Sequence, residues 1–326
     1  MVRTAASVIA SVVMVLVLVS PGWSQSAGAP RHLQDEDWPF VTSERCIACH
    51  SGLTTGVGED VSIGFNWRSS MMANSARDPY WQAAVRREVL DHPEAQTAIE
   101  DKCSTCHMPM ARFRAAAAGQ GGEVFANLAA GAGGAVAAFD GASCTVCHQI
   151  LSQNLGEPES FTGGFLVDTT RPLDEREIFG PLDVDEGRKH LMRSASRFIP
   201  QQADHIQSAE LCATCHTLYT HALNDEGEVV GELAEQVPYL EWTHSEYQYR
   251  RSCQSCHMPV VSDSTAIASV VGQPRSGLSR HVFRGGNAFM LSMLNKYRAD
   301  QAVAALPVEM DASVRRATEN LRNLSA

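Results

Sequence analysis

The most constraining feature of the sequence is the pattern C-x-x-C-H, which occurs five times and uses all ten cysteines of the chain. The five copies begin at Cys46, Cys103, Cys144, Cys212 and Cys253. On a helical turn, residues three apart lie on one face. Both thiols of a copy can therefore bond one porphyrin, while the histidine that follows is placed under the ring. C-x-x-C-H is the attachment signature of c-type haem, so the sequence predicts five covalently bound haems.

Paired cysteines also occur in zinc knuckles, redox dithiols and disulfide frameworks. None of these requires a histidine directly after the second cysteine, yet all five copies have one. Covalent haem c is therefore the preferred interpretation over zinc and redox dithiols. The predicted attachment residues are Cys46, Cys49, Cys103, Cys106, Cys144, Cys147, Cys212, Cys215, Cys253 and Cys256. The predicted proximal iron ligands are His50, His107, His148, His216 and His257.

The N-terminus has the pattern of a secretory signal peptide, which we assign to residues 1–29. A basic residue at position 3 precedes an uncharged run over residues 4–19, and small residues lead to Ala27-Gly28-Ala29. We therefore predict a periplasmic or otherwise exported protein with no membrane span after cleavage. An uncleaved anchor is the alternative, although the apolar run is short for a spanning helix of about 20 residues. Export agrees with haem attachment, which takes place outside the cytoplasmic membrane.

The rest of the chain divides into a pentahaem domain over residues 30–300 and a C-terminal helix over 301–326, with a further domain conceivable beyond it. The net charge of −11 argues against nucleic acid as a partner. An acidic electron-transfer protein is expected to meet redox proteins that carry basic docking patches.

We predict a mainly α fold with long loops and little β structure, organised around a haem array because there is little chain per haem to build an ordinary core. Asp78-Pro79 is a helix start, so we expect a helix over 79–91 and a second from Pro93 into the motif at 103–107. Apolar spacing predicts packing helices around 289–297 and from Pro307 onward.

Three other segments have weaker patterns. The alanine- and glycine-rich residues 115–142 are expected to form a loosely packed helix and loop on the surface. Residues 151–187 carry many turn signals and are expected to be irregular, with at most one short strand pair. The aromatic residues between 237 and 251 are expected to pack against haem and core from a helix.

Each haem iron takes a second axial ligand, whose identity sets its potential and reactivity. Seven histidines lie outside the motifs, and His32, His221 and His244 stand in polar or flexible surroundings. The candidate distal ligands are His92, His205 and His281, with His190 less favoured. One haem is then short of a histidine. Methionine is an established partner of histidine on haem iron, so Met71 or Met72 is the candidate for it, most plausibly on the first haem.

Several pieces of the chain resemble the multihaem cytochromes of the cytochrome c-552/4 (cytochrome c-554-like) group. They are Trp67–Met72, Cys103–Pro109, Glu210–His216 and His281–Asn287, and the similarity spans roughly residues 40–300. The resemblance implies a periplasmic electron-transfer protein with closely stacked, mostly bis-histidine haems. This chain departs from the group's four-haem member in having five motifs, and in having methionines after Trp67.

We therefore expect an electron carrier rather than an enzyme. The alternative is a multihaem oxidoreductase that acts on small nitrogen or sulfur compounds at one haem with an open axial position. A carrier needs every axial position filled, whereas an enzyme needs one open. The C-x-x-C-K variant that marks a known nitrite-reducing haem is not present in the sequence.

Overall fold

The structure, a computed structural model, describes residues 38–224 and 226–324. The signal-peptide prediction for residues 1–29 lies outside this part. About 48% of the chain is helical and 10% is strand, which confirms the mainly α prediction. No helix among the described residues is both long enough and apolar enough to cross a membrane.

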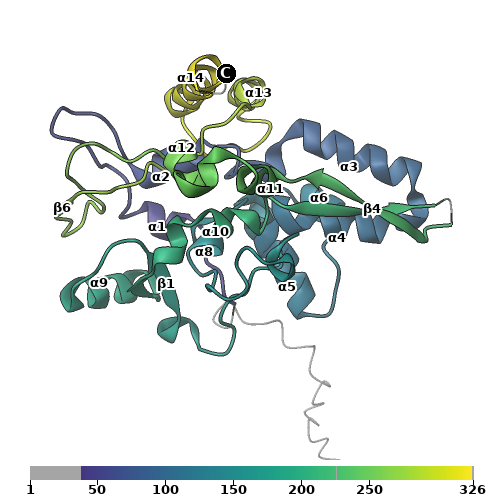
Figure 1. The fold of residues 1–326 in the computed structure, drawn as a ribbon, viewed down its shortest axis with the longest axis horizontal. Coiled ribbons are helices and arrows are strands. Elements are labelled where there is room, and N and C mark those ends of the chain that lie inside the picture. Colours follow the sequence, from purple (N-terminus) through teal and green to yellow (C-terminus); the bar gives the residue numbers. More distant parts are fainter. Residues whose placement is uncertain (1–37, 225, 325–326) are drawn as a thin grey trace, which may run out of the picture.

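The five motifs lie on short helices or helix ends in the middle part of the molecule, with α9 (Glu186–Ser196), β4 (Val229–Gln236), α13 (Ala288–Lys296) and α14 (Pro307–Asn323) toward its periphery (Figure 1). These helices are α1 (Glu44–Ile47), α4 (Gln96–His107), α8 (Cys144–Cys147), α10 (Ala209–Ala213) and α12 (Cys253–His257). Between them run long irregular stretches that place other parts of the chain against the motifs. The fold thus positions five similar turns in one body.

A helical layer surrounds the second motif. It comprises α3 (Pro79–Asp91), α4, α5 (Pro109–Ala117), α6 (Val124–Gly134) and α7 (Val136–Phe139). The predicted helix start is confirmed, because the Asp78 carboxylate accepts hydrogen bonds from the backbone N–H groups of Tyr80 and Trp81. After the 3-10 turn at Pro93–Ala95, α4 runs into the motif as predicted.

The segment over residues 115–142 is more deeply buried than its composition indicates. Val124 is fully buried and Phe139 nearly so. Both pack in one hydrophobic cluster with Trp81, Val85 and Met108. The prediction that this segment lies on the surface was therefore wrong in part. Its few large apolar residues pack in the core beside the second motif, whereas its glycine-rich portion has no large apolar residue.

Within residues 38–224 and 226–324 the strands form three two-stranded sheets. In the parallel pair, β1 (Glu177–Gly180) lies beside β2 (Ile199–Gln202). In the antiparallel hairpin, β3 (Leu218–Leu223) lies beside β4 (Val229–Gln236). The third pair is β5 (Thr265–Ala266) with β6 (Pro274–Arg275). Strand β1 falls within the stretch predicted to be irregular, whereas the β3–β4 hairpin was not predicted.

The two C-terminal helices, α13 (Ala288–Lys296) and α14 (Pro307–Asn323), confirm the helix predictions there and pack against each other at the top of Figure 1. Helix α14 is tied to α2 (Ile63–Arg68) by an ion pair between Arg68 and Glu309, whose nitrogen and oxygen atoms are 2.5 Å apart. A hydrogen bond of 2.9 Å between the Ser69 and Ser313 hydroxyl groups lies beside it.

Two further helices complete the chain, α9 (Glu186–Ser196) and α11 (Pro238–Thr243), the latter leading toward the fifth motif. The aromatic residues around α11 differ in their burial. Tyr239 is buried and stacks with Trp242 at 5.6 Å between ring centres. Tyr247 and Tyr249 are 58% and 86% exposed. The packing expectation therefore holds for the first half of the cluster only.

Candidate haem sites

Each C-x-x-C-H copy forms a helical turn. The backbone N–H of the histidine donates to the carbonyl of the first cysteine at 2.9 Å in His50, 3.0 Å in His148 and 2.9 Å in His216. His107 and His257 lie at the ends of their own helices. All ten cysteines have free thiols. The local requirement for attachment, two thiols on one face of a turn with a histidine after them, is met five times.

Four of the five predicted proximal histidines have their rings anchored in the same way. Nδ1 hydrogen-bonds a backbone carbonyl: His50 with Ile267 at 2.7 Å, His107 with Ser75 at 3.0 Å, His148 with Phe179 at 2.6 Å and His257 with Arg284 at 2.6 Å. A backbone carbonyl can only accept, so Nδ1 carries the proton and Nε2 keeps its lone pair. Such a bond on the far nitrogen is the usual support for a metal-binding histidine. His216 has no such bond among the described residues.

The segments that supply these carbonyls also clamp the backbone of the motifs. The Phe179 N–H donates to the His148 carbonyl at 2.7 Å, and the Arg284 N–H donates to the His257 carbonyl at 3.1 Å. At the second motif the Ser75 hydroxyl donates to the His107 carbonyl at 2.9 Å. Each of these three histidines is thus held at both its ring and its backbone by a single residue from elsewhere in the chain.

Thiols of different motifs approach one another. Cys46 lies beside Cys144, Cys106 beside Cys215, and Cys212 beside Cys253. In the first of these pairs, the Cys46 thiol and burial raise the pKa of Cys144. Burial, followed by the charge of Cys215, raises the pKa of Cys147 to about 12. The first motif therefore adjoins the third, and the fourth adjoins both the second and the fifth.

The first and third motifs are also joined through Asp140. Its carboxylate accepts from the backbone N–H and the hydroxyl of Ser43, at 2.8 and 2.7 Å. Burial, the largest cause, raises the pKa of Asp140. Nearby, the Thr145 hydroxyl donates to the Val41 carbonyl at 2.8 Å. These bonds connect the residues just before Cys46 with those on either side of Cys144.

Among the predicted distal ligands, His281 lies against a proximal histidine. Its ring is 6.1 Å from that of His148 between centres, and the two planes differ by 17°. The Ser279 carbonyl lies 3.0 Å from His281 Nδ1. Burial, followed by the charge of His148, lowers the pKa of His281 to about 3, so the ring is neutral at pH 7. The adjacent Arg280 is paired with Glu59 at 2.6 Å.

The other distal candidates have different surroundings. His92 is the half-buried residue that ends α3. His190 is exposed on α9. His205 Nε2 lies 2.8 Å from the Ile150 carbonyl, and its ring meets Phe179 edge-on at 5.0 Å. Their roles as ligands remain predictions.

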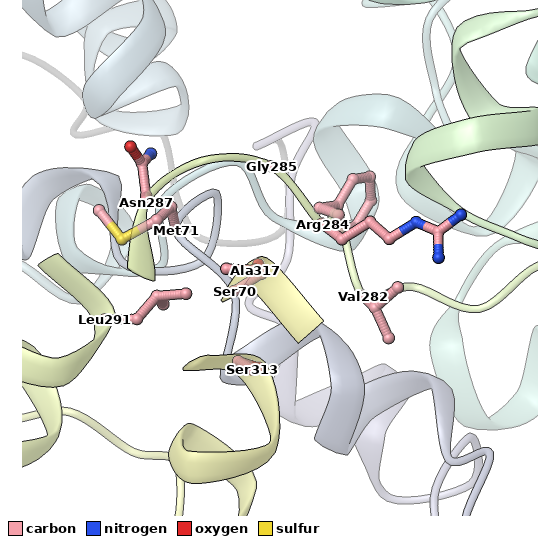
Figure 2. Close-up of a pocket in the computed structure, with 10 residues that line it drawn as sticks. Ser70, Met71, Val282, Arg284, Gly285, Asn287, Leu291, Ser313 and Ala317 are labelled. Carbon is pink, nitrogen blue, oxygen red and sulfur yellow. The ribbon is translucent and has the colours of Figure 1, made fainter. Parts of the chain in front are cut away.

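Met71 packs against the C-terminal helices, in the hydrophobic cluster that contains Leu291 and Leu294. It lines a cavity of about 40 Å³ between α13, α14 and the segment after Val282. Figure 2 shows its thioether beside Asn287 and Leu291, with the Arg284 guanidinium extending the other way. A cavity of this size is far smaller than the 300–1,000 Å³ or so of a small-molecule pocket. Ligation by Met71 or Met72 stays a prediction.

Sequence reasoning missed the residues that hold the rings. The Trp81 indole stacks on the His107 imidazole with 4.3 Å between centres and 2° between planes. The carbonyls that anchor the other rings belong to Ile267, Phe179 and Arg284. Backbone acceptors have no residue-type signature, so no pattern in the sequence indicates them. For Trp81 alone the sequence contained an indirect indication, because this residue lies on the helix predicted over 79–91.

These residues fit covalent haem. None of the ten thiols forms a disulfide. In four of the five imidazoles Nδ1 is bonded to a carbonyl, so the Nε2 lone pair can bind a metal. Within the described residues, no group of three or more histidine, cysteine, aspartate or glutamate side chains converges on a point that would hold a metal ion by itself. No family model, curated protein or solved structure matches this chain.

Proposed function

We propose that this protein is an exported, multihaem c-type cytochrome that transfers electrons between redox partners through five covalently bound haems. The observation that carries the proposal is the combination of five C-x-x-C-H turns with Nδ1 anchoring of four of their histidines. A zinc knuckle or a redox dithiol would not require a histidine directly after the second cysteine in every copy. The secretory pattern of residues 1–29 supports a periplasmic location.

A covalently held c-type haem supplies one-electron transfer at its iron. The chain's own residues have three tasks in this proposal. The paired cysteines retain the cofactor, the anchored histidines present a neutral Nε2, and the contacts between motifs keep neighbouring attachment points close together. The closeness of Cys46 to Cys144, of Cys106 to Cys215 and of Cys212 to Cys253 supports passage of electrons between neighbouring motifs.

The proposed partner is a redox protein with a basic docking surface. Besides the net charge of −11, the β3–β4 hairpin supports this: it contains no lysine or arginine between residues 218 and 236. Every residue of β4 is exposed, including Val229, Val230 and Leu233 at 60–65%. Burial raises the pKa of Cys103 to about 12, and the Glu235 carboxylate on this hairpin adds to the rise. A partner on β4 would therefore lie near the second motif.

The deciding experiment is a haem count on the mature protein. Intact mass after extraction of non-covalent haem should show five retained haem masses, and pyridine haemochrome absorbance should give five haems per chain. Four or fewer in a fully matured sample would overturn the proposal. Carbon monoxide added to the reduced protein then separates a carrier, which takes up none, from an oxidoreductase with an open iron, which binds one equivalent.

A further inference from the structure

We infer that His148 and His281 are the two axial ligands of one haem iron, the one attached at Cys144 and Cys147. This rests on the proposed function and deepens it, because it identifies the pairing of one distal histidine with one motif. The histidines are far apart in sequence, and the structure brings their rings together.

The spacing of the rings is the first argument. A metal–imidazole bond is about 2 Å long. Two such bonds in line, together with the distance from each bonded nitrogen to the centre of its ring, separate the two ring centres by about 6 Å. The observed separation is 6.1 Å. The face-to-face pair Trp81–His107 is closer, at 4.3 Å, whereas the nearly parallel pairs Tyr239–Trp242 and Phe113–Phe165 lie 5.6 and 6.4 Å apart. Within the described residues no hydrogen bond joins the two imidazoles, so the 6.1 Å separation is not that of a hydrogen-bonded pair, and it matches the separation expected across a shared metal ion.

The orientation of the rings is the second argument. The planes differ by only 17°, and each Nδ1 lies near a backbone carbonyl, Phe179 for His148 and Ser279 for His281. Both tautomers are thereby set with the proton on Nδ1 and the lone pair on Nε2. Two neutral imidazoles of this tautomer are what a shared metal requires.

The support around His281 is the third argument. Val282 is buried, Phe283 meets the His281 ring edge-on at 6.0 Å, and Arg284 clamps the fifth motif through its backbone and its Nε bond to the Cys256 carbonyl at 2.7 Å. Arg280 is fixed on the other side by Glu59. The short segment that carries His281 is therefore fixed at both ends. This keeps the imidazole in one position, as a metal ligand requires.

The test replaces His281 and follows spin state instead of activity. In His281→Ala, with five haem masses retained, one haem per chain should change from low spin to high spin in the ferric electron paramagnetic spectrum. The reduced variant should bind one more equivalent of carbon monoxide than the wild type, and imidazole added at millimolar concentration should restore the low-spin signal. His244→Ala is the matched control, because that ring is exposed and hydrogen-bonded to the Leu240 carbonyl; it should change nothing.

The assignment to the third motif is tested by a double change. In a protein that lacks the third haem through Cys144→Ala and Cys147→Ala, His281→Ala should produce no further high-spin signal. Should His281→Ala fail to accumulate, His281→Met keeps a ligand. It should then give the weak charge-transfer band of methionine ligation near the red edge and raise the potential of one haem.

An unchanged spectrum with five haems in place would overturn the pairing and leave the proposed function intact. A new high-spin signal that persists without the third haem would assign His281 to another iron and overturn it equally. Fewer than five haems in the wild-type protein would instead overturn the proposed function.

Discussion

The second and third motifs hold their proximal histidines alike but differ in what lies against the ring. His107 and His148 each bond a backbone carbonyl through Nδ1. Against His107 lies the indole of Trp81, in direct contact and from the same helical layer. Against His148 lies His281, farther away and from the C-terminal third of the chain. An indole nitrogen is a donor only, so the comparison separates a packing neighbour from a group that can bind a metal.

The largest effect should come from removing either motif. Cys103→Ala with Cys106→Ala, and Cys144→Ala with Cys147→Ala, should each lower the intact mass by one haem. Only loss of the third haem should release the segment around His281, so trypsin should cleave at Arg280 and Arg284 faster in that variant. Limited proteolysis followed by mass spectrometry measures this. Equal cleavage in the two variants would show that His281 depends on neither motif.

Trp81 should matter for stability and not for spin state. The residue is buried at 8% exposure, and truncation of a buried tryptophan costs about 3–5 kcal/mol of unfolding free energy. Trp81→Ala should therefore lower the denaturant midpoint strongly while the ferric spectrum stays that of the wild type. Trp81→Phe, which keeps an aromatic ring, should lose less. A high-spin signal in Trp81→Ala would mean that the indole positions an axial ligand.

Two aspartates extend the comparison to the surroundings of the motifs. Asp140 joins the first motif to the third through Ser43, whereas Asp101 makes its bonds within the layer of the second motif, to Gly122 and Arg112. Asp140→Ala leaves a buried Ser43 N–H without its acceptor, which should cost about 1–3 kcal/mol. Asp101→Ala should cost less, since its carboxylate is partly exposed. Denaturant unfolding of both variants checks the order, and a larger loss for Asp101 would reverse it.

The same aspartate predicts a pH dependence. Burial raises the pKa of Asp140 above 3.8, its ordinary value, so the carboxyl group stabilises the fold most when it is protonated. That contribution is complete below pH 3.8 and declines as pH rises through the raised pKa. Relative to wild type, the stability deficit of Asp140→Asn should shrink as pH increases over this window. A deficit that grows with pH would show that the charged form is the favoured one.

The smallest expected effect is on the rate of electron transfer with a partner, and it comes from the β3–β4 hairpin near the second motif. Glu228→Gln with Glu232→Gln removes two charges from the β3–β4 hairpin, and electron transfer with a small basic c-type cytochrome should slow several-fold at low ionic strength and not at high salt. Asp183→Asn with Glu186→Gln is the matched control, near α9 on the opposite side of the molecule in Figure 1. An equal slowing in both variants would show that net charge, not the hairpin, attracts the partner.

Local pattern was enough to predict several helices, and the haem prediction for the motifs rests on local pattern as well. The cap at Asp78, the prolines at 79, 93 and 307, and the C-x-x-C-H spacing each act within a few residues, so they can be recognised before the fold is known. The β3–β4 hairpin and the burial of Val124 and Phe139 were not predicted. An exposed acidic strand such as β4 and an alanine-rich helix have little periodicity in their apolar residues.

What the sequence alone determined is the spacing of the ten thiols and five histidines that we propose hold haem, since that spacing lies within one turn in each motif. What only the tertiary structure decided is which motifs adjoin and what lies across from each histidine. Nothing near Cys144 in the sequence indicates Phe179 or His281, yet both lie at the His148 ring. The physical reason is that a backbone carbonyl has no sequence signature, and that a second imidazole needs only to reach the ring in space, from any position along the chain.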